Sequence, residues 1–275
     1  IAVFYKEDGS ADTYFIPAEL PVHTFIDTQI IAESPDEYFW AGIGDAFSKG
    51  PEVELSSREV ELLHSPLMGR ALAAGACIEP LFDNAEQALA DKRAGVVSEA
   101  FENVVLNIIV TAGIVSNMTT NLGAERGAYY FNSSTAHAFY NAFTALGERG
   151  EKHLHGEVVS FGTCVLYAFD GNLKALEEQV ALNRKLGLPT TLADLDITPE
   201  SVDADLDIIV ERAQKTNEWG RAPYGFTTDR FRQAILDTDA YGRAVASGEK
   251  DQEAAALDVI AAHAPSAETA VPRKM

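Results

Sequence analysis

Apolar residues recur three and four positions apart along most of the chain, which is the spacing that places side chains on one face of an α-helix. The Gly187-Leu188-Pro189 segment is typical of the end of such a helix. Helices are predicted over residues 60–74, 84–116, 136–146, 158–169, 174–186, 201–215 and 228–246. The pattern therefore predicts a mainly α-helical protein.

The first residues follow a different pattern. Residues 1–5 and 13–16 are rich in β-branched and aromatic side chains, and Asp8-Gly9 between them is a strong turn signal, so they predict a hairpin. Residues 22–26 predict one further short strand. Because a lone hairpin is only marginally stable in water, we expect these strands to belong to a larger sheet.

Composition narrows the class of protein. The chain has 47% hydrophobic and 23% charged residues, as in ordinary globular proteins, and a net charge of -21. This excess of carboxylates argues against nucleic acid and anionic membranes as partners. The two cysteines, Cys77 and Cys164, are predicted to be buried thiols in a reducing compartment. No secretory signal is recognisable, and the apolar stretches at 104–115 and 158–169 are shorter than a membrane span. We expect a cytoplasmic protein that contacts no membrane.

A glycine-rich segment, Gly42-Ile43-Gly44-Asp45, is partly similar to a dinucleotide-binding fingerprint. It fails that pattern because Phe47 replaces the third glycine and because it follows a helix start rather than a strand. The local pattern instead predicts a break between two helices, with Asp45 in the first turn of the second, where the helix dipole favours a carboxylate.

Two histidines lie at predicted helix starts, His137 within Ala136-His137-Ala138 and His155 within Leu154-His155-Gly156. Taken singly, each is a typical surface or hydrogen-bonded core residue. Together with Asp45 they would offer one carboxylate oxygen and two imidazole nitrogens, a donor set suited to Zn²⁺ or Fe²⁺. Nothing in the local sequence shows that the three meet in space.

These segments resemble a known family when they are taken in order along the chain. Residues 27–32, the Ala41–Ala46 segment and the two histidine motifs are similar to glycerol dehydrogenases of the iron-containing alcohol dehydrogenase family. The 18-residue separation of the histidines (155 − 137) fits as well, and residues 186–192 are similar to a later segment.

The resemblance implies a helical metal-binding domain of the dehydroquinate synthase-like fold at 33–275. It is preceded at 1–32 by the remaining strands of an α/β nucleotide-binding domain. Asp45, His137 and His155 inherit the role of catalytic metal ligands, with Zn²⁺ as first choice and Fe²⁺ as second. Ile1 and Tyr5 match the family's contacts on the nicotinamide side. The implied activity is NAD-linked oxidation of a small alcohol such as glycerol to the ketone, in a homo-oligomer.

Three departures from the family affect these expectations. The family's glycine-rich phosphate loop has no counterpart here, so residues 1–275 alone should bind NAD weakly or not at all. After Asp45, Lys49-Gly50-Pro51 predicts a helix stop. Residues 128–132 are aromatic rather than small and glycine-rich, which leaves the substrate open. An alternative is a hydroxycarboxylate dehydrogenase that reduces 2-oxo acids, and another is a non-catalytic metal-binding or oligomerisation module.

Four further residues near the motifs carry secondary predictions. Glu157 either orients a ligand or serves only the helix start, and His153 is predicted to be an exposed bystander. An anionic substrate would need a cation, and Arg126 and Lys152 are the nearest in sequence to the ligand motifs.

Overall fold

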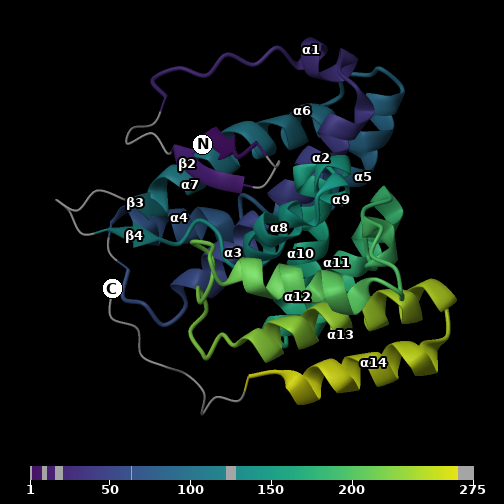
Figure 1. The fold of residues 1–275 in the computed structure, drawn as a ribbon. Coiled ribbons are helices and arrows are strands. Elements are labelled where there is room, and N and C mark those ends of the chain that lie inside the picture. Colours follow the sequence, from purple (N-terminus) through teal and green to yellow (C-terminus); the bar gives the residue numbers. More distant parts are fainter. Residues whose placement is uncertain (1, 8–10, 16–20, 63, 122–127, 266–275) are drawn as a thin grey trace.

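The computed structural model describes residues 2–7, 11–15, 21–62, 64–121 and 128–265. Helices dominate this part of the chain and surround a central helix, α10 (Figure 1). The strands are β1 (Ala2–Tyr5), β2 (Ala11–Phe15), β3 (Thr120–Asn121) and β4 (Tyr129–Tyr130). The helices up to β3 are α1 (Thr28–Glu33), α2 (Asp36–Ala46), α3 (Lys49–Ser57), α4 (Ser65–Ala74), α5 (Glu79–Arg93), α6 (Glu99–Leu106), the π-helix η1 (Asn107–Thr111) and α7 (Ala112–Met118).

The second half of the chain supplies the remaining helices. They are α8 (Thr135–Phe143), η3 (Thr144–Leu146), α9 (Glu148–Lys152), α10 (His155–Asp170), α11 (Leu173–Leu186), η4 (Ala193–Leu195), α12 (Val202–Ala213), α13 (Thr228–Ser247) and α14 (Lys250–His263). Helices α13 and α14 form an outer layer at one edge of the molecule (Figure 1). The expectation of a mainly helical fold is confirmed.

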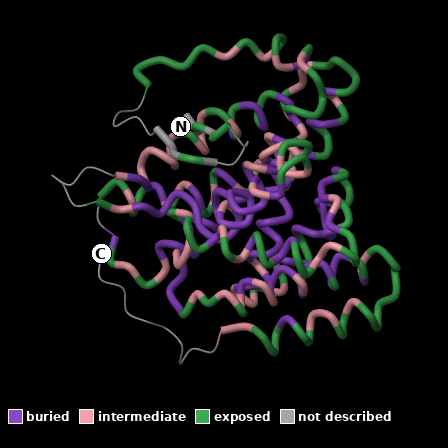
Figure 2. Tube along the Cα trace, viewed as in Figure 1, coloured by how far each residue is buried: buried purple, intermediate pink, exposed green. Residues whose placement is uncertain are grey.

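Helix α10 is apolar on nearly all sides, as expected for a helix in the middle of a protein core. Its residues from Val158 to Leu166 are all buried, and it packs against α2, α8, α11 and α13. Figure 2 shows buried residues concentrated in this central region, whereas α14 is mostly exposed. The helix ends at Gly171, whose φ of +74° is the left-handed conformation that favours glycine at a helix C-cap.

Most of the helices predicted after residue 130 lie within three residues of the observed ones. The long helix predicted over 84–116 is instead interrupted. Gly95 takes a φ of +69°, and the Ser98 hydroxyl accepts a hydrogen bond from the backbone N–H of Phe101 and so caps a new helix. The helical spacing of apolar residues runs through this turn without a visible break. Both α5 and α6 contribute buried apolar residues to one core cluster.

The hairpin predicted at the start of the chain is confirmed, with β1 and β2 antiparallel. The strand predicted at 22–26 is wrong, because this segment is irregular and exposed. Val22 and Phe25 are 90% and 93% exposed. A β-branched and aromatic run becomes a strand only where a partner supplies hydrogen bonds, and none of the described residues pairs with it.

Two predictions around Asp45 are also wrong. Helix α2 continues through Gly42-Ile43-Gly44-Asp45 and ends at Ala46, so Asp45 lies in its last turn rather than in a first turn. Lys49-Gly50-Pro51 does not stop a helix but begins α3. Proline is tolerated there because the first N–H groups of a helix have no intrahelical partner.

One apolar helical segment, Glu99–Met118, runs through α6, η1 and α7. Among the described residues it is long and apolar enough to cross a membrane, contrary to the shorter stretch predicted at 104–115. It packs against α2, α4 and α5, and 33% of its most apolar window is buried. Cys77 and Cys164 are buried free thiols, as predicted.

Candidate metal centre

Two glycines let the backbones of α2 and α10 touch. A Cβ atom added to Gly156 would lie 1.8 Å from the carbonyl oxygen of Ala41, and one added to Gly44 would lie 2.4 Å from that of Gly156. Real Cβ atoms do not approach so closely, so each position requires glycine. This crossing places His155, at the first turn of α10, beside Asp45 in the last turn of α2.

A third glycine brings α8 to the same place. A Cβ atom added to Gly162 would lie 2.6 Å from the carbonyl oxygen of Ala136. Helices α8 and α10 therefore pack with their backbones in contact, and His137 in the first turn of α8 faces His155 across 5.3 Å between ring centroids.

The three residues predicted to bind metal do converge. His155 Nε2 lies 3.2 Å from Asp45 Oδ1, and His137 Nε2 lies 3.6 Å from the same oxygen. One ligand atom from each lies within 4.8 Å of the others, so the group could hold a metal ion. Their side chains are 44%, 17% and 35% exposed for Asp45, His137 and His155. One side of the site is therefore open to solvent or substrate.

The sequence analysis missed a fourth residue, Glu52, because α3 was not predicted. Its side chain is fully buried, and Oε2 lies 2.6 Å from Nδ1 of His137. Oε1 accepts hydrogen bonds from the backbone N–H groups of Ser134 and His137 at 2.8 and 2.9 Å. The Ser134 side chain caps nothing, so Glu52 caps α8 from another helix. No periodicity or motif in the sequence signals this role.

The charges of the site depend on one another. Burial alone would lower the pKa of His137, but the carboxylates of Glu52 and Asp45 raise it to about 8. Loss of hydration would raise the pKa values of the partly buried Asp45 and the fully buried Glu52. Both pKa values are nevertheless lowered, that of Asp45 by His155 and His137 and that of Glu52 by His137. Asp45 sits where the helix dipole disfavours an anion, so the histidines, and not the dipole, stabilise its charge.

Other side chains surround the site. The ring of Tyr140 meets His155 edge-on, with centroids 4.1 Å apart. Lys49, one helical turn after Asp45, is buried, and its ammonium group donates to Oδ1 of Asn132 at 2.7 Å. The aromatic segment before His137 is anchored by Glu218, which accepts hydrogen bonds from the Tyr130 hydroxyl at 2.9 Å and from Ser133.

The structure contradicts one of the secondary predictions made for residues near the motifs and decides another. His153 is not an exposed bystander, since its side chain is 7% exposed and its ring nitrogens face Glu157 at 2.9 Å and Asp196 at 3.2 Å. Glu157 also accepts from the Leu154 N–H, so it serves the start of α10 rather than a predicted ligand. Lys152 is exposed and paired with Asp196. Ile1 and Arg126 lie outside the described residues, and Tyr5 ends β1.

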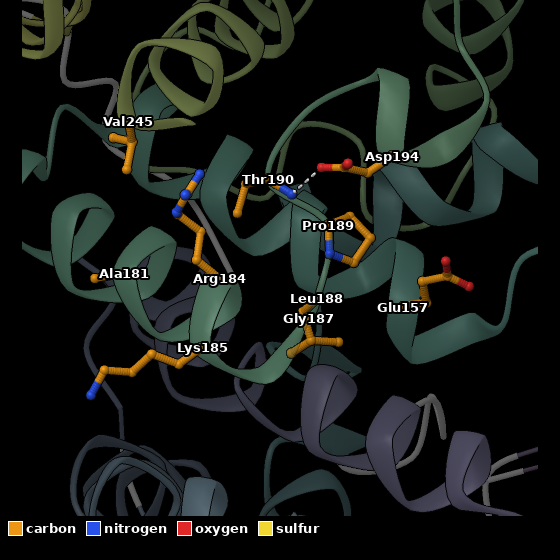
Figure 3. A pocket seen from close by; sticks show the side chains of 10 residues that line it. All are labelled: Glu157, Ala181, Arg184, Lys185, Gly187, Leu188, Pro189, Thr190, Asp194 and Val245. Atoms are coloured by element: carbon orange, nitrogen blue, oxygen red, sulfur yellow. Dashed lines mark hydrogen bonds between the residues drawn. The ribbon is translucent and has the colours of Figure 1, made fainter. Parts of the chain in front are cut away.

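A separate cavity of about 720 Å³ is lined by Glu157 and nine other residues (Figure 3). Arg184 stands on one wall and Glu157 on the other, with Pro189 between them. Asp45, His137 and His155 are not among its lining residues. The donor cluster is therefore a surface site distinct from this cavity.

Comparison with known proteins decides the family. No family model matches the chain. A glycerol dehydrogenase of Escherichia coli O6:H1 is 32% identical over 248 residues, which cover 88% of this chain and 64% of that protein. The chain is a homologue of the glycerol dehydrogenases in the iron-containing alcohol dehydrogenase family. The similarity lies in their C-terminal part.

Two more relatives support this family. The crystal structure of glycerol dehydrogenase from Schizosaccharomyces pombe superposes with a TM-score of 0.78 at 27% identity, over 90% of this chain and 61% of that one. Hydroxycarboxylate dehydrogenase A of Escherichia coli K12 is 28% identical over 88% of this chain and 64% of its own length. The chain thus spans less than two thirds of each of these glycerol dehydrogenase relatives.

Proposed function

We propose that Asp45, His137 and His155 bind one divalent metal ion, with Zn²⁺ preferred over Fe²⁺. In this proposal residues 33–275 are the metal-binding catalytic domain of an NAD-dependent alcohol dehydrogenase. Residues 1–32 belong to its cofactor-binding α/β domain, and Ile1 and Tyr5 lie toward the nicotinamide. The preferred substrate is a small polyol such as glycerol, which is oxidised to the ketone.

The observation that carries the proposal is the convergence of three ligand atoms from three helices within 4.8 Å. Residue 45 is far in sequence from residues 137 and 155, and glycine-mediated crossings of α2, α8 and α10 bring the three together. One carboxylate and two imidazoles form a donor set that suits Zn²⁺ and leaves a position for substrate, as catalytic zinc sites do. The partial exposure of all three side chains supports such an open position.

A metal ion held here would act as a Lewis acid on a substrate hydroxyl. The chain's own residues would bind the ion and orient the substrate. Asp45 contributes a negative charge, which offsets part of the charge of a divalent ion. Tyr140 packs against His155 and so limits the movement of that ring. Hydride acceptance is chemistry of the nicotinamide.

A vicinal diol suits this site because two adjacent hydroxyls can chelate a metal and so fix the reacting carbon. A carboxylate substrate would need a cation, and Lys49, whose positive charge acts on Asp45 and His137, is buried and hydrogen-bonded to Asn132. A neutral polyol needs no cation. The names of the glycerol dehydrogenase relatives support the same choice.

A second candidate activity is that of a hydroxycarboxylate dehydrogenase that reduces 2-oxo acids, and Lys49 is the observation that favours it. This residue follows Asp45 by four positions in the sequence, and its positive charge acts on both Asp45 and His137. Two of its three N–H donors serve Asn132, through Oδ1 and the backbone carbonyl. The third could reach a substrate carboxylate only if the buried ammonium became accessible, so the polyol remains our first choice.

Calorimetric titration of the 275-residue chain with Zn²⁺ tests the proposed site. We expect one ion per chain, and His155→Ala should weaken binding by far more than His153→Ala. The latter is a matched control, because His153 is two residues away and is hydrogen-bonded to Glu157 and Asp196. Equal losses in the two variants, or no binding by the parent chain, would contradict the assignment.

Kinetics on a protein that carries both halves would test the substrate. We expect a higher kcat/KM with glycerol and NAD than with a 2-oxo acid and NADH. A tenfold preference for the oxo acid, about 1.4 kcal/mol of transition-state discrimination, would reverse the choice. Zn²⁺ binding without any turnover of alcohols or hydroxy acids would favour the non-catalytic module instead.

A further inference from the structure

The three hydrogen bonds that the Glu52 carboxylate accepts all come from the start of the helix that carries His137. The side chain is fully buried, and one of the three bonds is to the His137 ring. The Nδ1 atom of the His137 ring faces Glu52, and the Nε2 atom faces Asp45.

We propose that Glu52 is a positioning residue that fixes the tautomer and the orientation of the His137 ring for metal binding. This inference rests on the proposed metal site and adds a residue to it. A carboxylate can only accept hydrogen bonds, so Nδ1 of a neutral His137 must carry the proton. Nε2 is then left with its lone pair directed toward Asp45, where a metal ion would be held. Such carboxylate–histidine pairs commonly orient the histidine ligands of metals.

The backbone contacts make this orientation rigid. Oε1 accepts from the N–H groups of Ser134 and His137, so the carboxylate cannot rotate without losing the cap of α8. Lys49, one turn earlier on α3, is likewise held by Asn132 just before α8. Helix α3 is therefore hydrogen-bonded to the start of α8 at two points. Both points restrain the position of the His137 ring.

The same geometry predicts the effect of Glu52→Gln. The amide oxygen of glutamine must take the place of Oε1, because the two backbone N–H groups need an acceptor. The amide NH₂ group then faces Nδ1 of His137, which must become the acceptor. The proton moves to Nε2, and the nitrogen directed at the metal position loses its free lone pair. The cap of α8 is preserved, so the change acts on the ring rather than on folding.

Glu218→Gln is the matched control. Glu218 is also buried and accepts hydrogen bonds from three side chains, those of Tyr130, Ser133 and Asn141. None of these hydrogen bonds involves the His137 ring. A general penalty for removing a buried carboxylate would appear in both variants, whereas loss of ring positioning would appear only in Glu52→Gln.

The experiment combines Zn²⁺ titration with nitrogen NMR of the imidazole rings in the metal-free chain at alkaline pH, where His137 is neutral. We expect the Nδ1–H tautomer in the parent chain and the Nε2–H tautomer in Glu52→Gln. Zn²⁺ affinity should fall by about 10- to 100-fold in Glu52→Gln and by far less in Glu218→Gln, whose carboxylate holds neighbouring side chains but not the His137 ring. In a His137→Ala background, Glu52→Gln should cause no further loss, since the ring it positions is gone.

An Nε2–H tautomer in the parent chain would overturn the inference, even if Glu52→Gln failed to fold. Equal Zn²⁺ affinity of the parent chain and a folded Glu52→Gln would overturn it as well. If the parent chain bound no Zn²⁺, the proposed function would fail, while the tautomer measurement would still decide the role of Glu52.

Discussion

Gly156→Ala should separate the helices that form the metal site. The added Cβ atom would lie 1.8 Å from the carbonyl oxygen of Ala41 and 2.9 Å from the backbone nitrogen of Asp45. Ordinary carbon–oxygen contacts are no shorter than about 3.3 Å, so α10 and α2 must move apart by about 1.5 Å. Both groups in the clash are backbone, and no side-chain rotation can relieve it.

This displacement would move the proposed metal ligands His155 and Asp45 apart. His155 precedes Gly156 directly, and its Nε2 lies 3.2 Å from Asp45 Oδ1. Metal–ligand distances tolerate deviations of only about 0.2 Å, so a shift of this size should weaken Zn²⁺ binding by at least about tenfold, or 1.4 kcal/mol. The overpacking should also lower the free energy of unfolding by about 3 kcal/mol, the upper end for such changes, because the clash is with backbone.

Zn²⁺ calorimetry and urea unfolding measure the two effects. Gly113→Ala is the control, since Gly113 lies in α7 and a Cβ atom added there meets nothing within 4 Å. That variant should gain up to about 1 kcal/mol of stability through helix propensity and keep its Zn²⁺ affinity. A Gly156→Ala variant with the stability and affinity of the parent chain would refute the close-crossing argument.

Two further predictions concern stability. Asp205→Asn should lower the free energy of unfolding by about 1–3 kcal/mol at pH 7, because it leaves Arg149 without its buried carboxylate partner. Burial would raise the pKa of Asp205, but Arg149 lowers it, so this contribution is present at neutral pH. It should shrink as pH falls below about 4, which urea unfolding at several pH values would show and a constant difference would contradict. The second prediction follows from the net charge of -21, because like charges repel one another in the folded chain. Raising NaCl from about 0.01 M to 1 M shortens the Debye length from about 30 to 3 Å and should therefore raise the Tm. A lower Tm would mean that attractive ion pairs outweigh this repulsion.

The sequence predicted the helices and the ligands better than it predicted their connections. The two histidine motifs lie at helix starts, as expected, because apolar periodicity marks α8 and α10 clearly. Asp45 was predicted as a ligand through the family resemblance, yet its place in a helix was wrong. Glycines normally weaken helices, so Gly42 and Gly44 indicated a break. Gly44 is instead required by the crossing with α10, a tertiary contact that local propensity cannot reveal.

Glu52 could not be predicted for a related reason. Pro51 indicated the end of a helix, whereas α3 begins only two residues earlier, where a missing N–H costs nothing. The functional role of Glu52 depends on its distance to residues 134 and 137, more than eighty positions away. Its sequence neighbourhood, Pro51-Glu52-Val53, looks like an ordinary first turn with an acidic residue.

The domain boundary near residue 32 and the homo-oligomer remain predictions. The hairpin at 2–15 is present, but a two-stranded sheet alone does not show the larger sheet to which we assign it. The matched region covers 64% of the length of the glycerol dehydrogenase of Escherichia coli O6:H1.

The central claim is that three side chains from three helices share one metal ion. Anomalous diffraction at the zinc edge from crystals of the Zn²⁺-loaded chain tests it most directly. We predict one strong peak within about 2.0–2.2 Å of a carboxylate oxygen of Asp45 and of Nε2 of both His137 and His155. A structure with no peak there, or with zinc bound only at other residues, would contradict the account.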